Sequence, residues 1–284
     1  MKILMTAGTD VGKLRTNNED AFCCRPNLDA TEARISSDYI AMGKWGCLSV
    51  VADGMGGPVA GELASSIAIA AIREFFSGNR LSGAHDKESF LKEAVKYAND
   101  AILQEVKTNG EATGMGTTLV LLWIVDNRAY VAWVGDSRGY VFHLKTGMRV
   151  LTKDHSYVQE LIDKGEISPK DALTHPDSNI ITRGLGDLDV SAQPDIVSCQ
   201  VEDGDIFLLC SDGLCGYVPD EVIERILCHY FRDIPSCCTK LIQCGLHAGG
   251  EENITVALVA TAPDHPYKSQ LGLLLRLRSF FSPK

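Results

Sequence analysis

The chain has 284 residues and a formal net charge of −10, because 37 aspartates and glutamates outnumber 27 lysines and arginines. Its hydrophobic fraction of 45% and charged fraction of 23% are ordinary globular values, which excludes disorder, collagen and coiled coil for the chain as a whole. An acidic surface repels phosphate backbones, so the composition argues against nucleic-acid binding. The same charge suits divalent cations wherever carboxylates converge.

Cysteine usage and hydropathy narrow the setting. The ten cysteines are too few for a disulfide scaffold at this length, and they lack the paired spacing of a metal site. We therefore expect reduced, mostly buried thiols in a cytoplasmic protein. No segment reaches the roughly 20 apolar residues of a membrane-spanning helix. The first residues do not form the apolar stretch of a signal peptide.

Short apolar runs alternate with longer amphipathic patterns along the chain. The runs predict strands at 46–52, 116–125, 129–134, 139–144, 206–210 and 253–260, and the patterns predict helices at 58–76, 88–107, 220–230 and 235–246. Turns at 126–127 and 145–147 join successive strands, which favours antiparallel pairing. Strands clustered apart from helices indicate an α+β fold, with antiparallel sheets covered by helices.

The segment 153–185 differs from its surroundings because it is polar and weakly periodic. We predict an irregular insertion with one or two short helices. Such a segment is either a plain connection or a flap beside a site. The motifs on both sides of it favour the flap.

Acidic residues recur where predicted strands end. Asp53, Asp136 and Asp212 each come directly after an apolar run, and further acidic pairs stand at 19–20 and 251–252. A single Asp-Gly is commonly a hairpin turn, but repetition after separate buried strands favours a site. Carboxylate and carbonyl oxygens without cysteine or histidine suit Mg²⁺ or Mn²⁺. Spacing alone leaves open whether these residues meet in space.

Eight short motifs resemble, in order and spacing, those of the metal-dependent Ser/Thr protein phosphatases of the PPM (PP2C-type) family, and the similarity is closest to the single-domain bacterial members. They are RTNNED (15–20), VADGMGG (51–57) with AGE (60–62), GMGTT (114–118), WVGDSR (133–138), LTKDHS (151–156), ITRGLG (181–186), LCSDGL (209–214) and NIT (253–255). The resemblance divides the chain into a phosphatase domain at 1–261 and a basic, apolar tail at 262–284.

The resemblance implies two stacked antiparallel β-sheets flanked by helices, with a two-metal centre at one end. It implies hydrolysis of phosphoserine and phosphothreonine by a hydroxide that bridges two Mn²⁺ or Mg²⁺ ions, with a third, weaker ion nearby. No phospho-enzyme is required. The implied partners are phosphoproteins, including a Ser/Thr protein kinase and its substrates, and the chain is expected to be a monomer.

The family's metal ligands carry over to individual positions of this sequence. Asp53 would bridge the two metals, and the Gly54 carbonyl would bind one of them. Asp212 would bind the other. Either Glu19 or Asp20 would hold the first metal, directly or through water, and we favour Asp20.

The remaining positions include one departure from the family. Asp136 resembles the residue that shares a third metal with Asp212, and Arg15 matches the arginine that clamps the substrate phosphate. The last motif usually reads Asp-Asn, but Glu252 replaces the aspartate and reaches about 1.5 Å further. Either the backbone shifts to compensate or the metal binds more weakly. Met55 stands after Asp-Gly, so no histidine acid follows, and metal-bound water would protonate the leaving alcohol.

Rival interpretations rest on fewer residues. The sequence GDSRG (135–139) fits the nucleophile elbow of serine hydrolases, but a strand-like run follows where that motif needs a helix. A catalytically weak or silent relative that acts as a binding module is supported only by Glu252. His155 is expected to be a structural hydrogen-bonding residue. The tail is either a packed helix or disordered end, or an interfacial or partner-binding segment.

Overall fold

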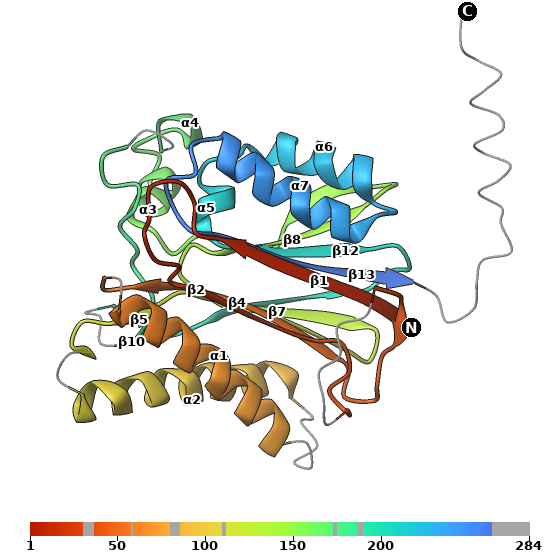
Figure 1. Cartoon of the computed structure of the whole chain (residues 1–284), viewed down its shortest axis with the longest axis horizontal. Coiled ribbons are helices and arrows are strands. Elements are labelled where there is room, and N and C mark those ends of the chain that lie inside the picture. The colour runs from red at the N-terminus through yellow and green to blue at the C-terminus, as the bar shows by residue number, and fades with distance from the viewer. Residues whose placement is uncertain are drawn as a thin grey trace, which may run out of the picture.

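The structure is a computed structural model that describes residues 1–30, 37–57, 59–79, 86–109, 112–172, 175–186 and 190–262. Within these residues two antiparallel β-sheets lie face to face, and helices cover both outer faces (Figure 1). The expected α+β architecture of stacked sheets flanked by helices is therefore confirmed. The tail predicted at 262–284 lies outside the described residues, apart from Ala262 at the end of the last strand.

The first sheet joins the two ends of the described chain. In spatial order it contains β3 (Ile40–Ala41), β1 (Lys2–Asp10), β13 (Ile254–Ala262), β12 (Ile206–Cys210), β8 (Arg138–His143) and β9 (Gly147–Val150). The second sheet contains β10 (Leu185–Gly186), β5 (Gly116–Thr117), β4 (Cys47–Met55), β6 (Leu119–Val125), β7 (Arg128–Val134) and β11 (Asp195–Gln200), with β2 (Asp20–Arg25) paired to β4.

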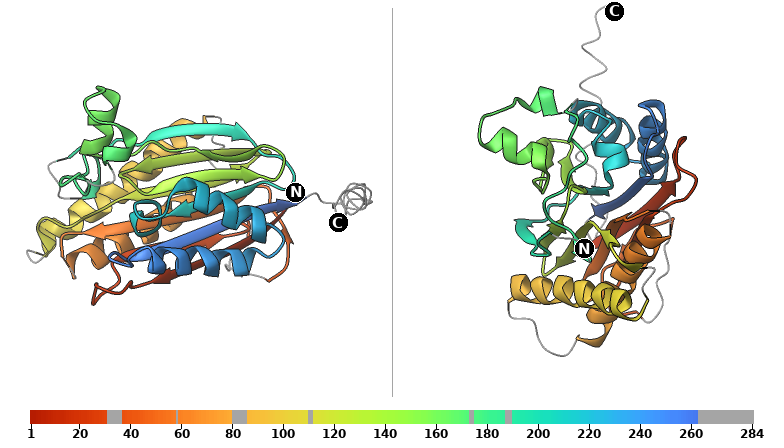
Figure 2. Two further views of the ribbon diagram at one scale, coloured as in Figure 1. Left: turned by 90° about the horizontal axis from the view of Figure 1, so that it is seen from above. Right: turned by 90° about the vertical axis from the view of Figure 1, so that its left-hand side faces the viewer.

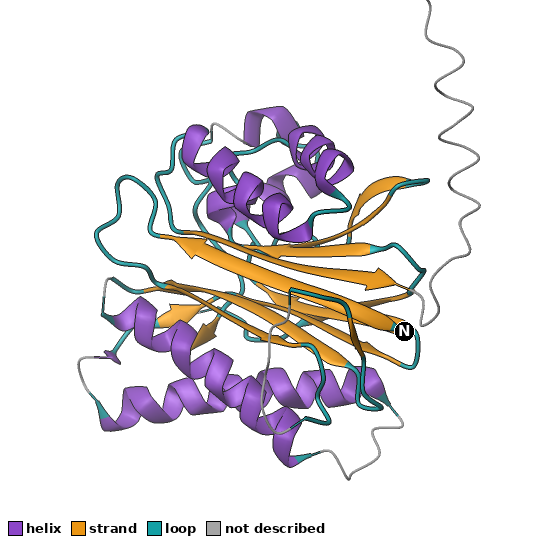
Figure 3. Ribbon diagram, turned by 45° about the vertical axis from the view of Figure 1, so that its right-hand side comes forward, coloured by secondary structure: helices purple, strands orange, loops and turns teal. Residues whose placement is uncertain are grey.

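Among the described residues, four long helices form two outer layers, and shorter helices lie at one end of the sandwich. Helices α1 (Ala60–Gly78) and α2 (Lys87–Thr108) cover the second sheet, and α6 (Asp220–Tyr230) and α7 (Ile234–His247) cover the first (Figure 3). The short helix α5 (Asp212–Cys215) follows β12 directly. The segment 153–185 carries α3 (Tyr157–Asp163) and α4 (Pro169–Ala172) at one end of the sandwich (Figure 2), as predicted for an irregular insertion.

The core has three parts that correspond to the layers. Between the sheets, side chains such as Val51, Val120 and Phe207 are completely buried. A second cluster lies under α1 and α2, and a third lies under α5, α6 and α7. Burial on both faces explains why β6 is a continuous apolar run rather than an alternating one. The packed layers fix where each strand ends, and the acidic residues stand at those ends.

The predicted helices and the central strands match the structure to within a few residues. The β6–β7 turn has Asp126 and Asn127 at φ of 50° and 57°, the left-handed backbone that a two-residue hairpin requires and that these residue types tolerate. The sequence did not predict β1, β2, β3, β9, β10 or β11. In β1, Gly8 weakens the strand pattern. A glycine suits this position because α7 packs closely against it, and a Cβ there would lie 2.9 Å from Ile242 Cδ1.

Candidate active site

One cavity collects most of the acidic residues that the sequence singled out. Its volume is about 280 Å³, and its lining includes seven of the eight predicted site residues: Arg15, Glu19, Asp53, Gly54, Asp136, Asp212 and Glu252. The eighth, Asp20, lies directly opposite Asp53 in the β2–β4 register. The predicted residues therefore meet in space, although they come from segments spread over almost the whole chain.

Asp53 is held by the strand next to it. Its backbone carbonyl accepts hydrogen bonds from Thr118 N (2.8 Å) and from Thr117 Oγ1 (2.8 Å). Its N–H donates to Thr118 Oγ1 at 3.1 Å. Because these contacts fix the backbone at the end of β4, the carboxylate of Asp53 has a set direction into the cavity.

Asp20 is positioned from the opposite sheet. Ser211 Oγ donates to Asp20 Oδ2 at 2.8 Å, and the same hydroxyl accepts from Thr255 N at 2.9 Å. Ser211 thus ties β2 to the ends of β12 and β13. The other carboxylate oxygen, Asp20 Oδ1, is buried and has no hydrogen-bond partner among the described residues. A buried oxygen without a donor is costly unless a cation binds it.

Asn253 organises the loop that carries Arg15 and Glu19, a role that the sequence analysis missed. Its Oδ1 accepts from Glu19 N at 2.8 Å, and its Nδ2 donates to Val11 O and Asn17 O, both at 2.9 Å. The signal was its place in the NIT motif. Its role depends on the packing of the loop against the start of β13, which lies far from the loop in the sequence.

Two glycines let α1 approach the site. A Cβ on Gly54 would lie 2.1 Å from Gly61 O, and a Cβ on Gly61 would lie 1.9 Å from Glu19 Oε2. Ser65 Oγ in α1 donates to Glu19 O at 2.6 Å. The first turns of α1 therefore pack against the backbone of Gly54 and Glu19, and a larger residue at either glycine would push the helix away.

Burial, and after it mutual repulsion, raises the pKa values of the carboxyl groups of the site. Burial raises the pKa of Asp53 well above its usual range, and the charges of Asp20, Asp212 and Asp136 raise it further. Burial and then the charge of Asp212 raise the pKa of Asp136 to about 8. Burial raises the pKa values of Asp20 and Asp212 to about 6. Like charges crowded in this way are stabilised by bound cations.

The donor set fits hard divalent cations. Carboxylates and the nearby Gly54 carbonyl are oxygen ligands of the kind that Mg²⁺ and Mn²⁺ prefer. The buried Asp20 Oδ1, which accepts no hydrogen bond from the described residues, could bind a cation. In the described part of the chain, no three histidine, cysteine, aspartate or glutamate side chains form a ready-made metal cage. Five carboxylates line the cavity, from Glu19, Asp53, Asp136, Asp212 and Glu252, and these groups could hold a cation there.

Arg15 and Glu252 form an ion pair at the cavity wall. Arg15 Nη2 lies 2.6 Å from Glu252 Oε1 and 2.5 Å from Oε2. The side chains are 50% and 29% exposed. The glutamate that replaces the family's usual aspartate thus contacts the arginine expected to clamp phosphate, while it lines the same cavity as Asp212.

The rival site motifs have structural roles. Ser137 is 1% exposed, hydrogen-bonds to Thr118 Oγ1 at 2.7 Å, and precedes the strand β8 rather than a helix, so it does not form a nucleophile elbow. His155 Nδ1 accepts from Gly135 N at 3.2 Å, and its ring stacks on Trp133. As expected, His155 supports the turn that carries Asp136.

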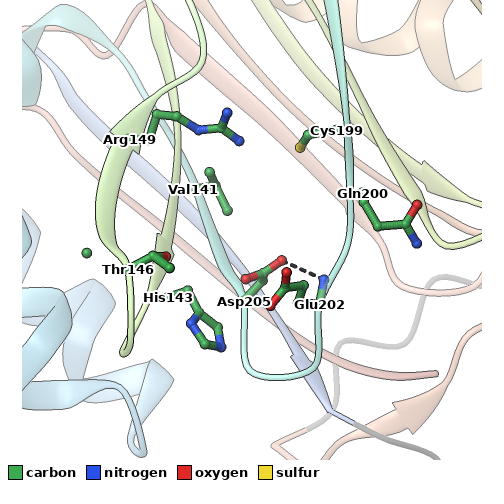
Figure 4. Close-up of a pocket in the computed structure, with 9 residues that line it drawn as sticks. Val141, His143, Thr146, Arg149, Cys199, Gln200, Glu202 and Asp205 are labelled. Atoms are coloured by element: carbon green, nitrogen blue, oxygen red, sulfur yellow. Dashed lines mark hydrogen bonds between the residues drawn. The ribbon is translucent and has the colours of Figure 1, made fainter.

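A second cavity lies at the ends of β8 and β12 that are farther from the first cavity (Figure 4). Its lining carries charges of both signs, from Arg149 and from Asp205 and Glu202. Asp205 already accepts a hydrogen bond from Glu202 N at 2.7 Å. Since its carboxylates do not converge with others from several strand ends, we assign the metal chemistry to the first cavity.

The raised pKa values predict how pH affects the metal-free protein. A carboxyl with a raised folded-state pKa contributes stability that is fully present below its unfolded pKa and is lost as pH rises through the folded value. For Asp136 this window extends from its usual value of 3.8 up to about 8. Asp136→Asn should therefore raise the melting temperature of EDTA-treated protein at pH 8.5 by about 3 °C and change it much less at pH 4.

Thermal unfolding followed by circular dichroism at the two pH values measures this effect. The matched control is Asp126→Asn, at the other end of β6, where the left-handed backbone accepts asparagine. Equal shifts at both pH values, or an equal shift in the control, would contradict the proposed crowding of carboxylates.

No helix in the described residues combines the length and apolar character needed to cross a membrane. All ten cysteines fall within these residues, and each is a free thiol. Burial raises the pKa values of several of them, including Cys24 to about 12. Seven of the ten are buried, as expected.

Comparisons with known proteins agree with this geometry. Residues 26–237 match the family model described as protein phosphatase 2C. The serine/threonine phosphatase stp of Listeria innocua is 36% identical over 252 residues, which cover 88% of this chain and 93% of that protein. PstP of Mycobacterium tuberculosis is 36% identical over 262 residues, which cover 92% of this chain but 45% of the relative.

Solved structures give the same result. The crystal structure of the Mycobacterium tuberculosis serine/threonine phosphatase PstP/Ppp has a TM-score of 0.75 at 33% identity, covering 93% of this chain and 100% of that one. The PstP catalytic domain in complex with two manganese ions has a TM-score of 0.74 at 33% identity, covering 92% and 99%. With the family model spanning most of the sequence and the carboxylates gathered in one cavity, this chain belongs to the protein phosphatase 2C, or PPM, family.

Proposed function

We infer that the chain removes phosphate from phosphoserine and phosphothreonine residues of proteins, with two Mn²⁺ or Mg²⁺ ions bound in the carboxylate cavity and a third, weaker ion beside them. The observation that carries the proposal is the meeting of Asp53, Asp136 and Asp212 around one cavity, with Asp20 opposite Asp53 in the β2–β4 register and Asp20 Oδ1 buried and unpartnered. Family membership and the names of the relatives support the reaction.

The position of each proposed ligand indicates which ion it would bind. Asp53 and Asp20, paired across β2 and β4, would hold one ion together with the Gly54 carbonyl, and Glu19 would contribute from the adjoining loop. Asp53, Asp212 and Glu252 would hold the second ion. Asp136 and Asp212 would hold the third ion. When bound, the ions supply a hydroxide nucleophile at neutral pH and neutralise the phosphoryl oxygens.

The remaining side chains would bind and orient the substrate. Arg15 is half exposed at the cavity wall, where its guanidinium can bind two phosphate oxygens. Asn253 keeps the Arg15 loop against β13, so the guanidinium and the carboxylates have a fixed relation. Met55 lines the cavity without a titratable group, and the leaving alcohol would take its proton from solvent held there.

The setting of this reaction is part of the proposal. The free thiols support a reducing compartment, which we take to be the cytoplasm. The substrates would be phosphoproteins, among them a Ser/Thr protein kinase and its targets, and the chain would act as a monomer. The direct test is release of phosphate from a phosphothreonine peptide with millimolar Mn²⁺. A protein that binds the peptide without releasing phosphate would instead be a silent relative.

Replacement of Arg15 tests the phosphate clamp. Arg15→Ala should raise KM for p-nitrophenyl phosphate about tenfold and change kcat much less, because the guanidinium contacts a phosphate present in both the ground and transition states. Lys13→Ala is the control, since Lys13 is exposed on the same loop and its backbone N–H donates to Gly250 O, a contact that the substitution keeps. A drop in kcat at unchanged KM would reject this role.

Replacement of Glu252 tests the departure from the family pattern. Glu252→Gln keeps the shape and removes the charge, so the Mn²⁺ concentration for half-maximal rate should rise about tenfold. Direct Mn²⁺ binding, measured by electron paramagnetic resonance, should weaken in parallel. Glu251→Gln is the matched control, because Glu251 is exposed next to it. Identical Mn²⁺ titrations for wild type and Glu252→Gln would remove Glu252 from the metal site.

A further inference from the structure

We propose that three exposed apolar side chains on segments that line the cavity, Leu14, Val59 and Ile180, recognise apolar residues that flank the phosphorylated serine or threonine of a protein substrate. This recognition surface rests on the proposed phosphatase function and adds the chemistry of the preferred substrate. We call these three residues the apolar rim.

The apolar rim is unusual in its exposure. Val59 is 78% exposed, Leu14 is 69% exposed and Ile180 is 46% exposed. Val59 and Leu14 are the two most exposed large apolar side chains among the described residues. A single exposed apolar residue needs no explanation, but several of them on segments that line one cavity indicate a binding surface.

Each residue of the rim adjoins the cavity lining in sequence. Leu14 precedes Arg15, Val59 follows the glycines at 56–57, and Ile180 stands between two lining residues at 179 and 181. The three therefore come from the loop after β1, the start of α1 and the segment after α4. A hydrogen bond links two of these segments, since Asn17 Nδ2 donates to Glu62 Oε2 at 3.0 Å.

Backbone hydrogen bonds hold each segment of the apolar rim in place, so its exposed side chain has a fixed position. Next to Leu14, Lys13 N donates to Gly250 O at 2.6 Å. Val59 O accepts from Leu63 N at 3.2 Å as α1 begins. Ile180 O accepts from Tyr157 N at 2.8 Å, which fixes the flap segment to α3. Preorganised apolar contacts of this kind bind a partner without a large ordering cost.

Charge around the opening selects against acidic substrates. Glu62 and Glu251 are exposed beside the rim, and the chain carries a net charge of −10. Acidic residues flanking a phosphosite would be repelled, whereas Leu, Ile, Val or Phe would bury apolar area against the rim. The occupant that fits is an extended segment of a phosphoprotein with apolar neighbours on both sides of the phosphorylated residue.

The test compares phosphothreonine peptides that have leucine and valine, alanine, or glutamate as flanking residues. The readout is kcat/KM for each peptide divided by kcat/KM for p-nitrophenyl phosphate, which has no flanking residues. We expect the wild-type ratio to be highest for the apolar peptide. Leu14→Ser, Val59→Ser and Ile180→Ser should each lower that ratio about three- to tenfold and should not affect the glutamate peptide in the same way.

Leu144→Ser is the matched control, because this side chain is 47% exposed at the turn between β8 and β9, at the end of β8 that lies away from Asp136. Unchanged ratios in all three rim variants would overturn the recognition surface, as would equal hydrolysis of the apolar and glutamate peptides. So would a wild-type dimer that the rim variants convert to a monomer with the ratio unaltered. A wild type inactive on p-nitrophenyl phosphate with Mn²⁺ would overturn the phosphatase proposal itself.

Discussion

Asp53→Asn should lower the phosphatase rate by at least about a thousandfold, because it removes the charge that both proposed metals share and that the transition state depends on. The substitution preserves the size of the side chain and leaves the three backbone contacts to Thr117 and Thr118 in place. The variant should therefore fold normally. Removal of one buried carboxylate also relieves repulsion from Asp20, Asp212 and Asp136.

Initial rates with p-nitrophenyl phosphate over a range of Mn²⁺ concentrations give the measurement, and circular dichroism verifies the fold. Asp126→Asn serves as the control, because Asp126 also follows a buried strand but at the opposite end of the sheet. Wild-type activity in Asp53→Asn would reject the site. A comparable loss in Asp126→Asn would show that strand-end substitutions impair the enzyme through folding.

Removal of divalent cations should reduce activity to background, and added Mn²⁺ should restore it. The physical reason is that the described residues of the cavity offer no cysteine or histidine nucleophile, while carboxylates dominate its lining. Exhaustive chelation followed by gel filtration, with rates before and after addition of Mn²⁺, Mg²⁺ or Ca²⁺, tests this. Full activity in the chelated protein would contradict a metal-dependent reaction.

Much of this site was predictable because strand ends are local features. The apolar runs before Asp53 and Asp212 predict strands that end at a rigid acidic residue. In the structure β4 runs through Asp53 to Met55, and β12 ends at Cys210, two residues before Asp212. The helices were equally clear, since each shows a long amphipathic pattern. Burial on both faces made the central strands of the second sheet easy to recognise as uninterrupted apolar runs.

The contacts that complete the site were not predictable, because they join distant segments. Arg15 and Glu252 are 237 residues apart and meet only because β1 and β13 pair along their whole length. Asn253 reaches Glu19 for the same reason. Register decides that Asp20 faces Asp53, and a shift of one residue in β2 would turn Asp20 away.

The most direct test of the central claim, that the carboxylate cavity is a two-metal centre, is the anomalous diffraction of a crystal of this chain grown with Mn²⁺. We predict anomalous peaks inside the cavity, with Asp53 contacting two ions, Asp20 and Gly54 on one side and Asp212 on the other. Glu252 would then lie within direct or water-bridged reach of the ion on the Asp212 side. Mn²⁺ peaks confined to other surfaces, with Asp53 and Asp212 free of metal, would contradict the account.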